Sequence, residues 1–422
     1  MNIARACYSI GWLLLLPVVL ARLIWRARLQ PEYLRHLGER FGRYACADSR
    51  PLIWIHAVSV GETRAAQPLV EQLLRTYPGH RLLITHMTPT GRDTSESLWG
   101  SRVARAYLPY DLPFATRAFL RHWQPRLGIL METELWPNLI VACHQQRVPL
   151  LLANARLSER SARGYRRLSA LAMPALGQLS AVAAQTEDDA TRLGELGAPQ
   201  PHVVGNIKFD VSIPPAALLL GDNFRQQIGP RPVLLAASTR EGEEAPLLTA
   251  FARLAPPACL LLLVPRHPQR FDEVAALATR QGLPLQRRSE GGPVQASTRV
   301  WLGDSMGEMA AYYRVADVAF VGGSLLPLGG QNLIEACAQG VPVLIGPHTF
   351  NFAAASAEAT AAGAAERVED AEAVITRALA LLSNAPARQA MGDAGRAFSD
   401  RHRGATARTL ALVQTLYPIP RA

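Results

Sequence analysis

The sequence predicts an α/β protein in which two doubly wound parallel sheets each form a domain. Three observations favour this fold class. At 422 residues the chain is longer than one ordinary core requires. Hydrophobic residues make up 49% of the chain and charged residues 18%, proportions typical of a folded protein. Short apolar runs alternate with helical stretches, as in parallel sheets covered on both faces, and this pattern occurs twice.

The expected strands are continuous apolar runs of three to five residues. They are residues 52–56, 82–85, 127–131, 150–152, 181–184 and 202–204 in the first half, and residues 233–236, 260–264, 318–321 and 343–345 in the second. Between the two sets, Pro214 and Pro215 are typical of a linker. The alanine-rich residues 353–365 indicate a helix that is broken at Gly363.

Three segments follow from this pattern. Residues 1–28 form an N-terminal membrane anchor, residues 29–205 a first Rossmann-like domain, and residues 206–422 a second one whose last helix can pack back on the first. Parallel sheets of this kind bind ligands at the carboxyl ends of their strands, so we expect a cleft between the domains, with one ligand on each.

The N-terminal segment predicts the membrane attachment. Residues 6–21 are uncharged and mostly apolar, and Arg22 can extend to the lipid surface, which brings the apolar length to Trp25 close to the ~20 residues of a spanning helix. A cleaved signal peptide is the alternative, but no Ala-x-Ala site is present and Arg26 and Arg28 follow the apolar core. These arginines favour an uncleaved anchor, single-pass or monotopic, with the domains on the cytoplasmic side.

Positive charge is concentrated in the first half of the chain. Residues 1–205 hold 24 basic and 15 acidic side chains, whereas residues 206–422 hold 20 and 19. The excess suggests an anionic partner, which could be nucleic acid, a membrane surface or an acidic substrate, or it is only a solvated surface. Nucleic acid is disfavoured because no binding motif accompanies the arginines. The five cysteines are scattered, without disulfide or metal-ligand spacing, so neither a metal nor a cofactor is expected.

One lysine stands among 44 basic residues, and the other 43 are arginine. Lysine is a compact point charge, whereas arginine is a planar fork, so the two are not interchangeable at a site that holds a single oxygen. Lys208 is therefore either a functional cation or an accident of arginine-rich composition.

Acidic residues follow two expected strands of the first domain. Glu62 begins a helix after a glycine turn, where a carboxylate either complements the helix dipole or acts as a general base. Glu132 and Glu134 come directly after residues 127–131. They either cap the next helix or point into the same cleft as Glu62.

The second domain carries groups suited to phosphate. Arg266 follows Pro265 at a strand end. It either binds a phosphate through two N–H groups of its guanidinium or is only a surface arginine. Residues 322–324 are Gly-Gly-Ser, and paired glycines either form only a turn or expose backbone N–H groups. In residues 329–336, the helix expected near Asn332 offers its N-terminus to a phosphate, and Glu335 can bind a ribose diol. Acidic residues on one domain and residues suited to bind phosphate on the other indicate a two-domain glycosyltransferase that uses a sugar nucleotide.

The chain resembles the 3-deoxy-D-manno-octulosonic acid (Kdo) transferases, which attach Kdo to the lipid A precursor in lipopolysaccharide core biosynthesis. The matching segments run in order along nearly the whole chain: residues 59–63, 87–91, 107–111, 131–138, 154–158, 208–210, 241–244, 265–268, 320–324 and 346–352. Two local departures are Gln331, where the family usually has histidine, and Leu333-Ile334 in place of Pro-Leu. Neither changes Asn332 or Glu335.

The resemblance implies a GT-B fold and an inverting transferase. The donor would be CMP-Kdo, the acceptor the tetraacylated lipid A precursor (lipid IVA) on the anionic inner-membrane surface, and CMP the released product. By the same resemblance Glu62 is the general base, and Glu132 and Lys208 stabilise the transition state. The CMP site would consist of Pro265, Arg266, Met306, Gly307, Glu308, Asn332, Leu333, Ile334 and Glu335. The alternatives are a transferase with another nucleotide sugar and lipid-linked acceptor, or a nucleotide-binding scaffold without catalysis.

Overall fold

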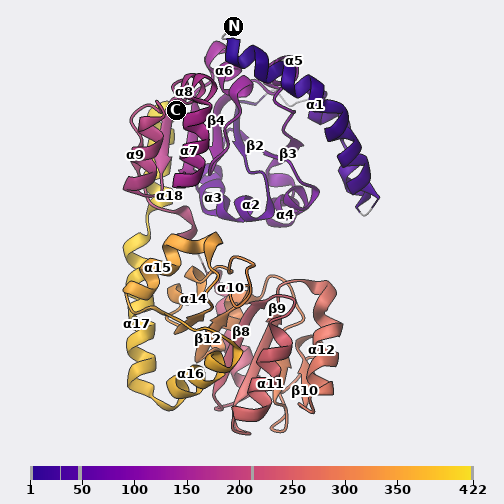
Figure 1. Cartoon of the computed structure of the whole chain (residues 1–422), viewed down its shortest axis with the longest axis vertical. Coiled ribbons are helices and arrows are strands. Elements are labelled where there is room, and N and C mark those ends of the chain that lie inside the picture. The colour runs from indigo at the N-terminus through magenta and orange to yellow at the C-terminus, as the bar shows by residue number, and fades with distance from the viewer. Residues whose placement is uncertain (1–2, 29, 46–49, 211–212, 420–422) are drawn as a thin grey trace. The chain divides into compact units, whose positions relative to one another are not determined.

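The computed structural model describes residues 3–28, 30–45, 50–210 and 213–419. The chain divides into two compact units: unit 1 is Met1–Asp210 with Arg403–Ala422, and unit 2 is Val211–His402 (Figure 1). Unit 1 thus includes residues 206–210, which the sequence-based boundary assigned to the second domain, and also the last helix of the chain.

Unit 1 is built on a parallel seven-stranded sheet with the order β3-β2-β1-β4-β5-β6-β7. The strands are β1 (Leu52–His56), β2 (Arg81–His86), β3 (Ala104–Tyr107), β4 (Pro125–Met131), β5 (Leu150–Ala155), β6 (Ala181–Ala184) and β7 (His202–Val203). Every residue of β1, β5 and β6 is buried, because helices cover both faces of the sheet.

The helices of unit 1 connect these strands, except for the first and the last. They are α1 (Ile3–Ala27), α2 (Val60–Ala65), α3 (Gln67–Thr76), α4 (Pro89–Trp99), α5 (Pro113–Trp123), α6 (Pro137–Gln145), α7 (Glu159–Arg167), α8 (Ser169–Leu176), α9 (Glu187–Glu195) and α18 (Ala405–Leu416), with 3-10 turns at Pro31–Leu34, Leu37–Phe41, Gly100–Arg102 and Ile207–Phe209.

Helix α18, the last helix of the chain, belongs to unit 1. The hydroxyl of Tyr77, just beyond α3, donates to the carbonyl of Tyr417 at 2.7 Å. At the start of α18, the carboxylate of Asp210 accepts the backbone N–H groups of Gly404 and Thr406. The last helix therefore packs on the first sheet domain, although it follows the second in the sequence.

Unit 2 repeats the architecture with the strand order β10-β11-β9-β8-β12-β13-β14, again all parallel. Its strands are β8 (Val233–Thr239), β9 (Leu260–Pro265), β10 (Leu285–Arg287), β11 (Val300–Leu302), β12 (Val318–Val321), β13 (Val343–Ile345) and β14 (Ala365–Arg367). Its helices are α10 (Pro215–Ile228), α11 (Glu244–Leu254), α12 (Phe271–Arg280), α13 (Met309–Val315), α14 (Ile334–Ala338), α15 (Ala353–Ala361), α16 (Ala371–Ser383) and α17 (Ala385–His402), with 3-10 turns at Pro268–Arg270, Arg288–Glu290 and Phe350–Phe352.

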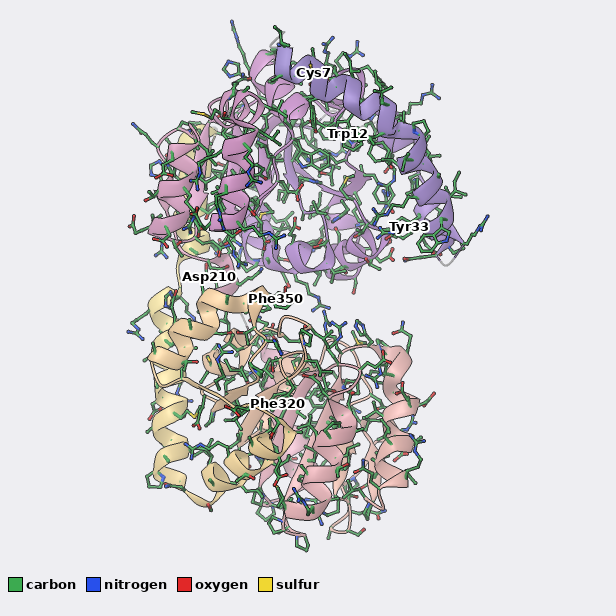
Figure 2. All side chains as sticks on the ribbon, in the orientation of Figure 1. Cys7, Trp12, Tyr33, Asp210, Phe320 and Phe350 are labelled. Carbon is green, nitrogen blue, oxygen red and sulfur yellow. The ribbon has the colours of Figure 1, made fainter. Side chains whose placement is uncertain are left out.

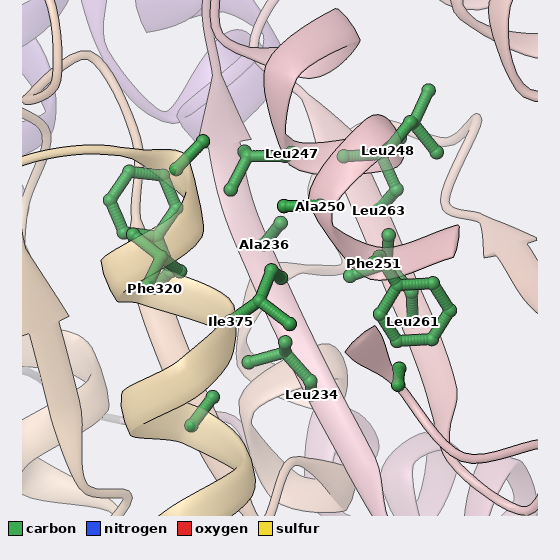
Figure 3. Close-up of a cluster of buried hydrophobic side chains, with 14 of the residues drawn as sticks. Leu234, Ala236, Leu247, Leu248, Ala250, Phe251, Leu261, Leu263, Phe320 and Ile375 are labelled. Atoms are coloured by element: carbon green, nitrogen blue, oxygen red, sulfur yellow. The ribbon is translucent and has the colours of Figure 1, made fainter. Parts of the chain in front are cut away.

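The core of unit 2 lies between its central strands and α11 and α16. Leu234 of β8 and Leu261 of β9 pack against Phe251 of α11, and Ile375 of α16 covers the same cluster (Figure 3). All four side chains are almost fully buried, which excludes water from the sheet below the strand ends.

The structure confirms the expected fold class of two doubly wound parallel sheets. The alanine-rich helix α15 ends before Gly363, as expected, but Ala365 begins the short strand β14. Strands β3, β10, β11 and β14 were not expected from the sequence. Each is only three or four residues long, and β3, β10 and β14 lie at the polar edges of the sheets.

Candidate active site

In each doubly wound sheet the strand order reverses at one point: successive strands are added on one side of it and later strands on the other. Ligands of such folds bind at this point, beyond the carboxyl ends of the strands. In unit 1 this point lies between β1 and β4. Glu62 follows β1 in α2, and Glu132 follows β4 directly. The first-domain acids singled out in the sequence therefore lie at the carboxyl edge of adjacent strands.

Glu62 is held by the loop that precedes its helix. Its Oε2 accepts the backbone N–H of Val58 at 2.8 Å, and the hydroxyl of Ser59 donates to its Oε1 at 3.4 Å. Burial raises the pKa of Glu62 to about 8; the Val58 N–H acts against this rise, and the carboxylates of Glu132 and Glu134 add to it. A carboxyl that titrates near neutral pH is suited to proton transfer.

Lys208 lies beside Glu132, although 76 residues separate them. The Nζ of Lys208 is 2.8 Å from Oε1 of Glu132, and about a quarter of each side chain is exposed. Glu132 has a φ of 59°, in the left-handed region that non-glycine residues rarely adopt. Such conformations cost of order 1–3 kcal/mol and often occur at functional sites.

Asn154, which sequence analysis did not assign, fixes the turn that carries Lys208. Its Oδ1 accepts the backbone N–H of Ile207 at 3.0 Å, and Asn206 Oδ1 accepts the N–H of Lys208 at 3.0 Å. Asn154 is fully buried at the carboxyl end of β5, with a φ of 54°. Residues 154–158 belong to the matching segments, but only the fold shows what Asn154 contacts.

Glu132 and Glu134 do not cap the helix that follows them. The N–H groups of Asn138 and Leu139, in the first turn of α6, donate to the two carboxylate oxygens of Asp111 at 3.0 and 2.8 Å. Glu134 instead accepts the indole N–H of Trp136 at 2.7 Å. The capping interpretation of these two acids is therefore wrong.

His56, at the end of β1, is not a proton carrier at neutral pH. Burial lowers its pKa to about 3, and the neighbouring His86 adds to the effect, so its ring is neutral. Its ring packs edge-on against Trp136 at a centroid distance of 5.8 Å. Glu62 is therefore the group at this edge whose pKa lies near neutral pH.

In unit 2 the corresponding point lies between β8 and β12. Glu243 lies just before α11, and its fully buried carboxylate joins the loops that follow these two strands. Its oxygens accept four backbone N–H groups at 2.6–3.0 Å, those of Arg240, Gly323, Ser324 and Leu325. A Cβ on Gly322 would lie 2.7 Å from Thr239 Cα, so only glycine permits this close approach.

This arrangement corrects the interpretation of the glycine pair. The N–H groups of residues 323–325 donate to Glu243, and those of Gly330 and Gln331 donate to the carbonyls of Gly323 and Gly322. They do not point to a phosphate, as the sequence suggested. Glu243 holds the loop in shape instead, a role that sequence analysis missed.

The other expected donor residues lie along the carboxyl edge of the same sheet. Pro265 is the last residue of β9, and Arg266 follows it. The backbone N–H of Arg266 donates to the carbonyl of Thr239. Met306 and Gly307 follow β11, and Met306 is 53% exposed.

The side chain of Glu308 is already engaged. It contacts Arg288 at 3.1 Å and accepts the Ser305 hydroxyl at 2.6 Å. The carboxylate therefore fixes the turn at residues 305–308.

Asn332 and Glu335 contact each other at the start of α14. Asn332 Nδ2 donates to Glu335 Oε1 at 2.9 Å, and Asn332 Oδ1 accepts the N–H of Ile334. The side chains of Leu333 and Ile334 are fully buried in unit 2. Only the backbone of these two residues can therefore reach a ligand.

Cations gather at the ends of β8 and β9. Burial lowers the pKa of His267, and the guanidinium groups of Arg240, Arg266 and Arg270 lower it further. Arg270 is engaged by Glu244 and Glu273. Arg240 was not singled out in the sequence, and it joins Arg266 as a candidate for binding an anion.

A cavity of about 300 Å³ lies elsewhere in unit 1, between α1, α6 and α8. Its walls include Arg5, Val141 and Leu171, and none of the candidate acids lines it. Within the part of the chain that the structure describes, no three histidine, cysteine or acidic side chains form a group that could hold a metal ion.

Two doubly wound parallel sheet domains are the architecture of the GT-B fold class. A glycosyltransferase structure from Rickettsia africae superposes with a TM-score of 0.58, covering 88% of this chain and 100% of that one at 14% identity. An Anabaena protein solved in complex with UDP and glucose gives a TM-score of 0.56 over 87% of this chain and 99% of that one, at 15% identity. These likenesses establish the fold.

Sequence comparison identifies the family. Residues 35–211 match the family described as 3-deoxy-D-manno-octulosonic-acid transferase (kdotransferase). A 3-deoxy-D-manno-octulosonic acid transferase of Bordetella pertussis is 50% identical over 88% of this chain and 89% of its own length. One of Haemophilus influenzae is 39% identical over 97% of this chain and 98% of its own. The chain belongs to the Kdo transferase family, which confirms the resemblance found in the sequence.

Proposed function

We propose that this Kdo transferase transfers Kdo from CMP-Kdo to the tetraacylated lipid A precursor, with inversion at the anomeric carbon and release of CMP. The observation that supports this most is Glu62, a half-buried carboxyl after a strand end whose pKa of about 8 lies near physiological pH. Membership of the Kdo transferase family indicates that the transferred sugar is Kdo.

Glu62 is the general base of the proposed reaction. An inverting displacement needs a base that takes the proton of the acceptor hydroxyl as the new glycosidic bond forms. The deprotonated form is the active one, so transfer increases as pH rises through the pKa of Glu62. The Val58 N–H orients the carboxylate for this step.

Lys208 and Glu132 form the charge-stabilising pair. Kdo carries a carboxylate, and the leaving group is the phosphate of CMP, so negative charge develops on the donor side. The ammonium of Lys208, oriented by Glu132 and by the turn that Asn154 holds, can meet a single oxygen of either group.

Unit 2 binds the CMP moiety. Arg240 and Arg266, at the ends of β8 and β9, place two guanidinium groups for the donor phosphate. Glu335, oriented by Asn332, accepts the ribose hydroxyls, and the backbone of residues 332–334 lies beside them. Pro265 and residues 306–308 complete the proposed site.

The acceptor is an anionic lipid, and unit 1 is suited to meet it. Unit 1 holds 28 basic and 16 acidic residues, whereas unit 2 holds 16 and 18. Helix α1 is 25 residues long with a mean hydropathy of 1.9 over its most apolar stretch, enough for a membrane anchor by length and composition. We place the enzyme on the cytoplasmic side of the inner membrane, because arginines follow α1.

Calorimetry with CMP and UDP tests the nucleotide assignment. We expect CMP to bind at least about tenfold more tightly than UDP, a difference of roughly 1.4 kcal/mol. Arg266→Ala should weaken CMP binding, whereas Arg253→Ala, an exposed arginine of α11 in the same unit, should not. Preference for UDP would instead favour a transferase with another nucleotide sugar.

A further inference from the structure

One face of α1 packs against the rest of unit 1: on α6, α8 and the cluster around Tyr110 over most of its length, and on the following turn Pro31–Leu34 near its end. Its inward residues recur every three or four positions, the spacing of a single helical stripe. They are Ser9, Trp12, Leu16, Val19, Leu23 and Ala27. Ser9, Leu23 and Ala27 are buried, and Trp12, Leu16 and Val19 pack on a cluster around Tyr110.

Polar contacts fix the first half of this face. Asn138 of α6 donates to the hydroxyl of Ser9 at 3.1 Å, and the same amide group donates to the carbonyl of Asp111 at 2.7 Å. The ring centroid of Trp12 lies 5.7 Å from that of Tyr110. Asp111 and Asn138 belong to segments shared with the Kdo transferases, and the proposed chemistry does not use them.

The opposite face of α1 is apolar and exposed. The exposed large side chains of the helix are Ile3, Ile10, Leu13, Leu14, Leu15, Val18, Ile24 and Trp25, each more than half exposed. Arg22, Arg26 and Arg28 are exposed toward the C-terminal end of this segment. A continuous apolar face of this size marks an interaction surface. Its flanking arginines and the tryptophan are typical of a helix at a lipid interface.

The packing of α1 decides between a spanning and an in-plane orientation. A 25-residue helix is about 37 Å long, so its length permits either. A spanning helix would be surrounded by lipid or other membrane segments. Asn138 of α6 contacts Ser9, and Asp111, between β3 and α5, contacts Asn138; both are buried and cannot enter the hydrocarbon at acceptable cost. Keeping these contacts requires α1 to stay on the surface of unit 1.

We propose that α1 lies in the plane of the membrane, with its inward face on unit 1 and its outward face in the lipid interface of an anionic bilayer. Both ends of the helix are then on the same side of the membrane. This inference rests on the membrane attachment proposed above, and it makes unit 1 a monotopic domain. The lipid-embedded face brings the basic unit 1 next to an acceptor held in the same leaflet.

Labelling both ends of α1 tests the orientation. Cys7, exposed on α1 (Figure 2), and Cys46 are replaced by serine, while Cys143, Cys259 and Cys337 remain buried. Ile3→Cys or Arg28→Cys is then introduced singly into the full chain. Spheroplasts of a Gram-negative host are treated with a membrane-impermeant maleimide, and labelling after detergent gives the total.

We expect neither end to label in spheroplasts and both to label after detergent. Labelling of only one end in spheroplasts means that α1 spans the bilayer, which would overturn the inference. Labelling of both ends would keep α1 in the plane but on the outer side, which would contradict the proposed cytoplasmic location instead.

Flotation with vesicles of phosphatidylethanolamine and phosphatidylglycerol tests the outward face. Leu14→Glu combined with Val18→Glu alters only exposed side chains and should reduce vesicle binding at least about tenfold. Leu219→Glu, a 66% exposed leucine of α10 in unit 2, is the matched control and should bind as the unaltered chain does. Equal binding of all three proteins would show that α1 does not meet lipid through this face.

Discussion

Lys208 is the residue whose meaning the structure changes most. In the sequence it is one lysine among arginines, and in the fold its ammonium lies 2.8 Å from Glu132. Two buried or half-buried amides, Asn154 and Asn206, fix the backbone of its turn. These contacts are those of a positioned side chain, so accidental retention of a lysine is the weaker explanation.

Replacing Lys208 with arginine keeps the charge and changes its shape. The planar guanidinium cannot occupy the same point beside Glu132 Oε1, so the charge on the donor is stabilised less well. We expect Lys208→Arg to lower kcat by about 10²-fold, the effect of removing one stabilising group. Steady-state transfer assays measure it, and an unchanged thermal unfolding midpoint is the control for folding. An unchanged kcat would make Lys208 a compositional accident.

Glu134 adds to the raised pKa of Glu62, after burial and the carboxylate of Glu132. A carboxylate near another one disfavours a second negative charge, so Glu134 raises the pKa of Glu62 toward about 8. Glu134→Gln removes that charge, which lowers the pKa of Glu62 and increases its deprotonated fraction at neutral pH. We expect the acidic limb of kcat/KM to move to lower pH, with activity at pH 7 raised about two- to threefold.

The matched control for this pH profile is Glu187→Gln in α9. Glu187 is exposed and does not contribute to the pKa of Glu62. Its profile should coincide with that of the unaltered enzyme. A limb that stays in place, or moves to higher pH, in Glu134→Gln would contradict the coupling.

At the scale of elements, the carboxyl edges of the two sheets carry the site. The central strands were predictable because they are continuous apolar runs, and β1, β4, β9 and β12 begin and end close to the expected residues. The edge strands were not, because they are short and contain polar residues such as Arg105 in β3 and Glu366 in β14.

The loops at these edges were only partly predictable. Residue types at strand ends indicated Glu62 and Arg266, since chemistry collects there in parallel sheets. Glu243 could not be assigned, because its carboxylate contacts N–H groups some 80 residues further along the chain. Contacts over such separations follow from the strand order, which the sequence does not show.

Glu243 shapes the loop that follows β12, and its replacement should affect the donor site. Glutamine has one oxygen where glutamate has two, and its amide group repels at least one of the four N–H donors. We expect Glu243→Gln to raise the KM for CMP-Kdo about tenfold or more, with a smaller effect on kcat. Glu241→Gln, an exposed neighbour, is the control. Equal donor KM values for the two variants would show that the loop does not need Glu243.

For the whole molecule, the structural boundary sharpens the charge asymmetry. The sequence-based halves carry net charges of +9 and +1, whereas units 1 and 2 carry +12 and −2, because residues 403–422, with three arginines and no acidic residue, belong to unit 1. A basic unit that bears an apolar helix is suited to an anionic lipid surface.

Product analysis by mass spectrometry tests the central claim most directly. The unaltered chain and Glu62→Gln are each incubated with CMP-Kdo and the tetraacylated lipid A precursor, and CMP binding is measured on both. We predict Kdo-bearing lipid with the unaltered chain, and at least about a 10³-fold slower reaction with Glu62→Gln while CMP binding persists. Equal product from both proteins would remove Glu62 from the mechanism, and no product from either, with CMP still bound, would leave a nucleotide-binding scaffold.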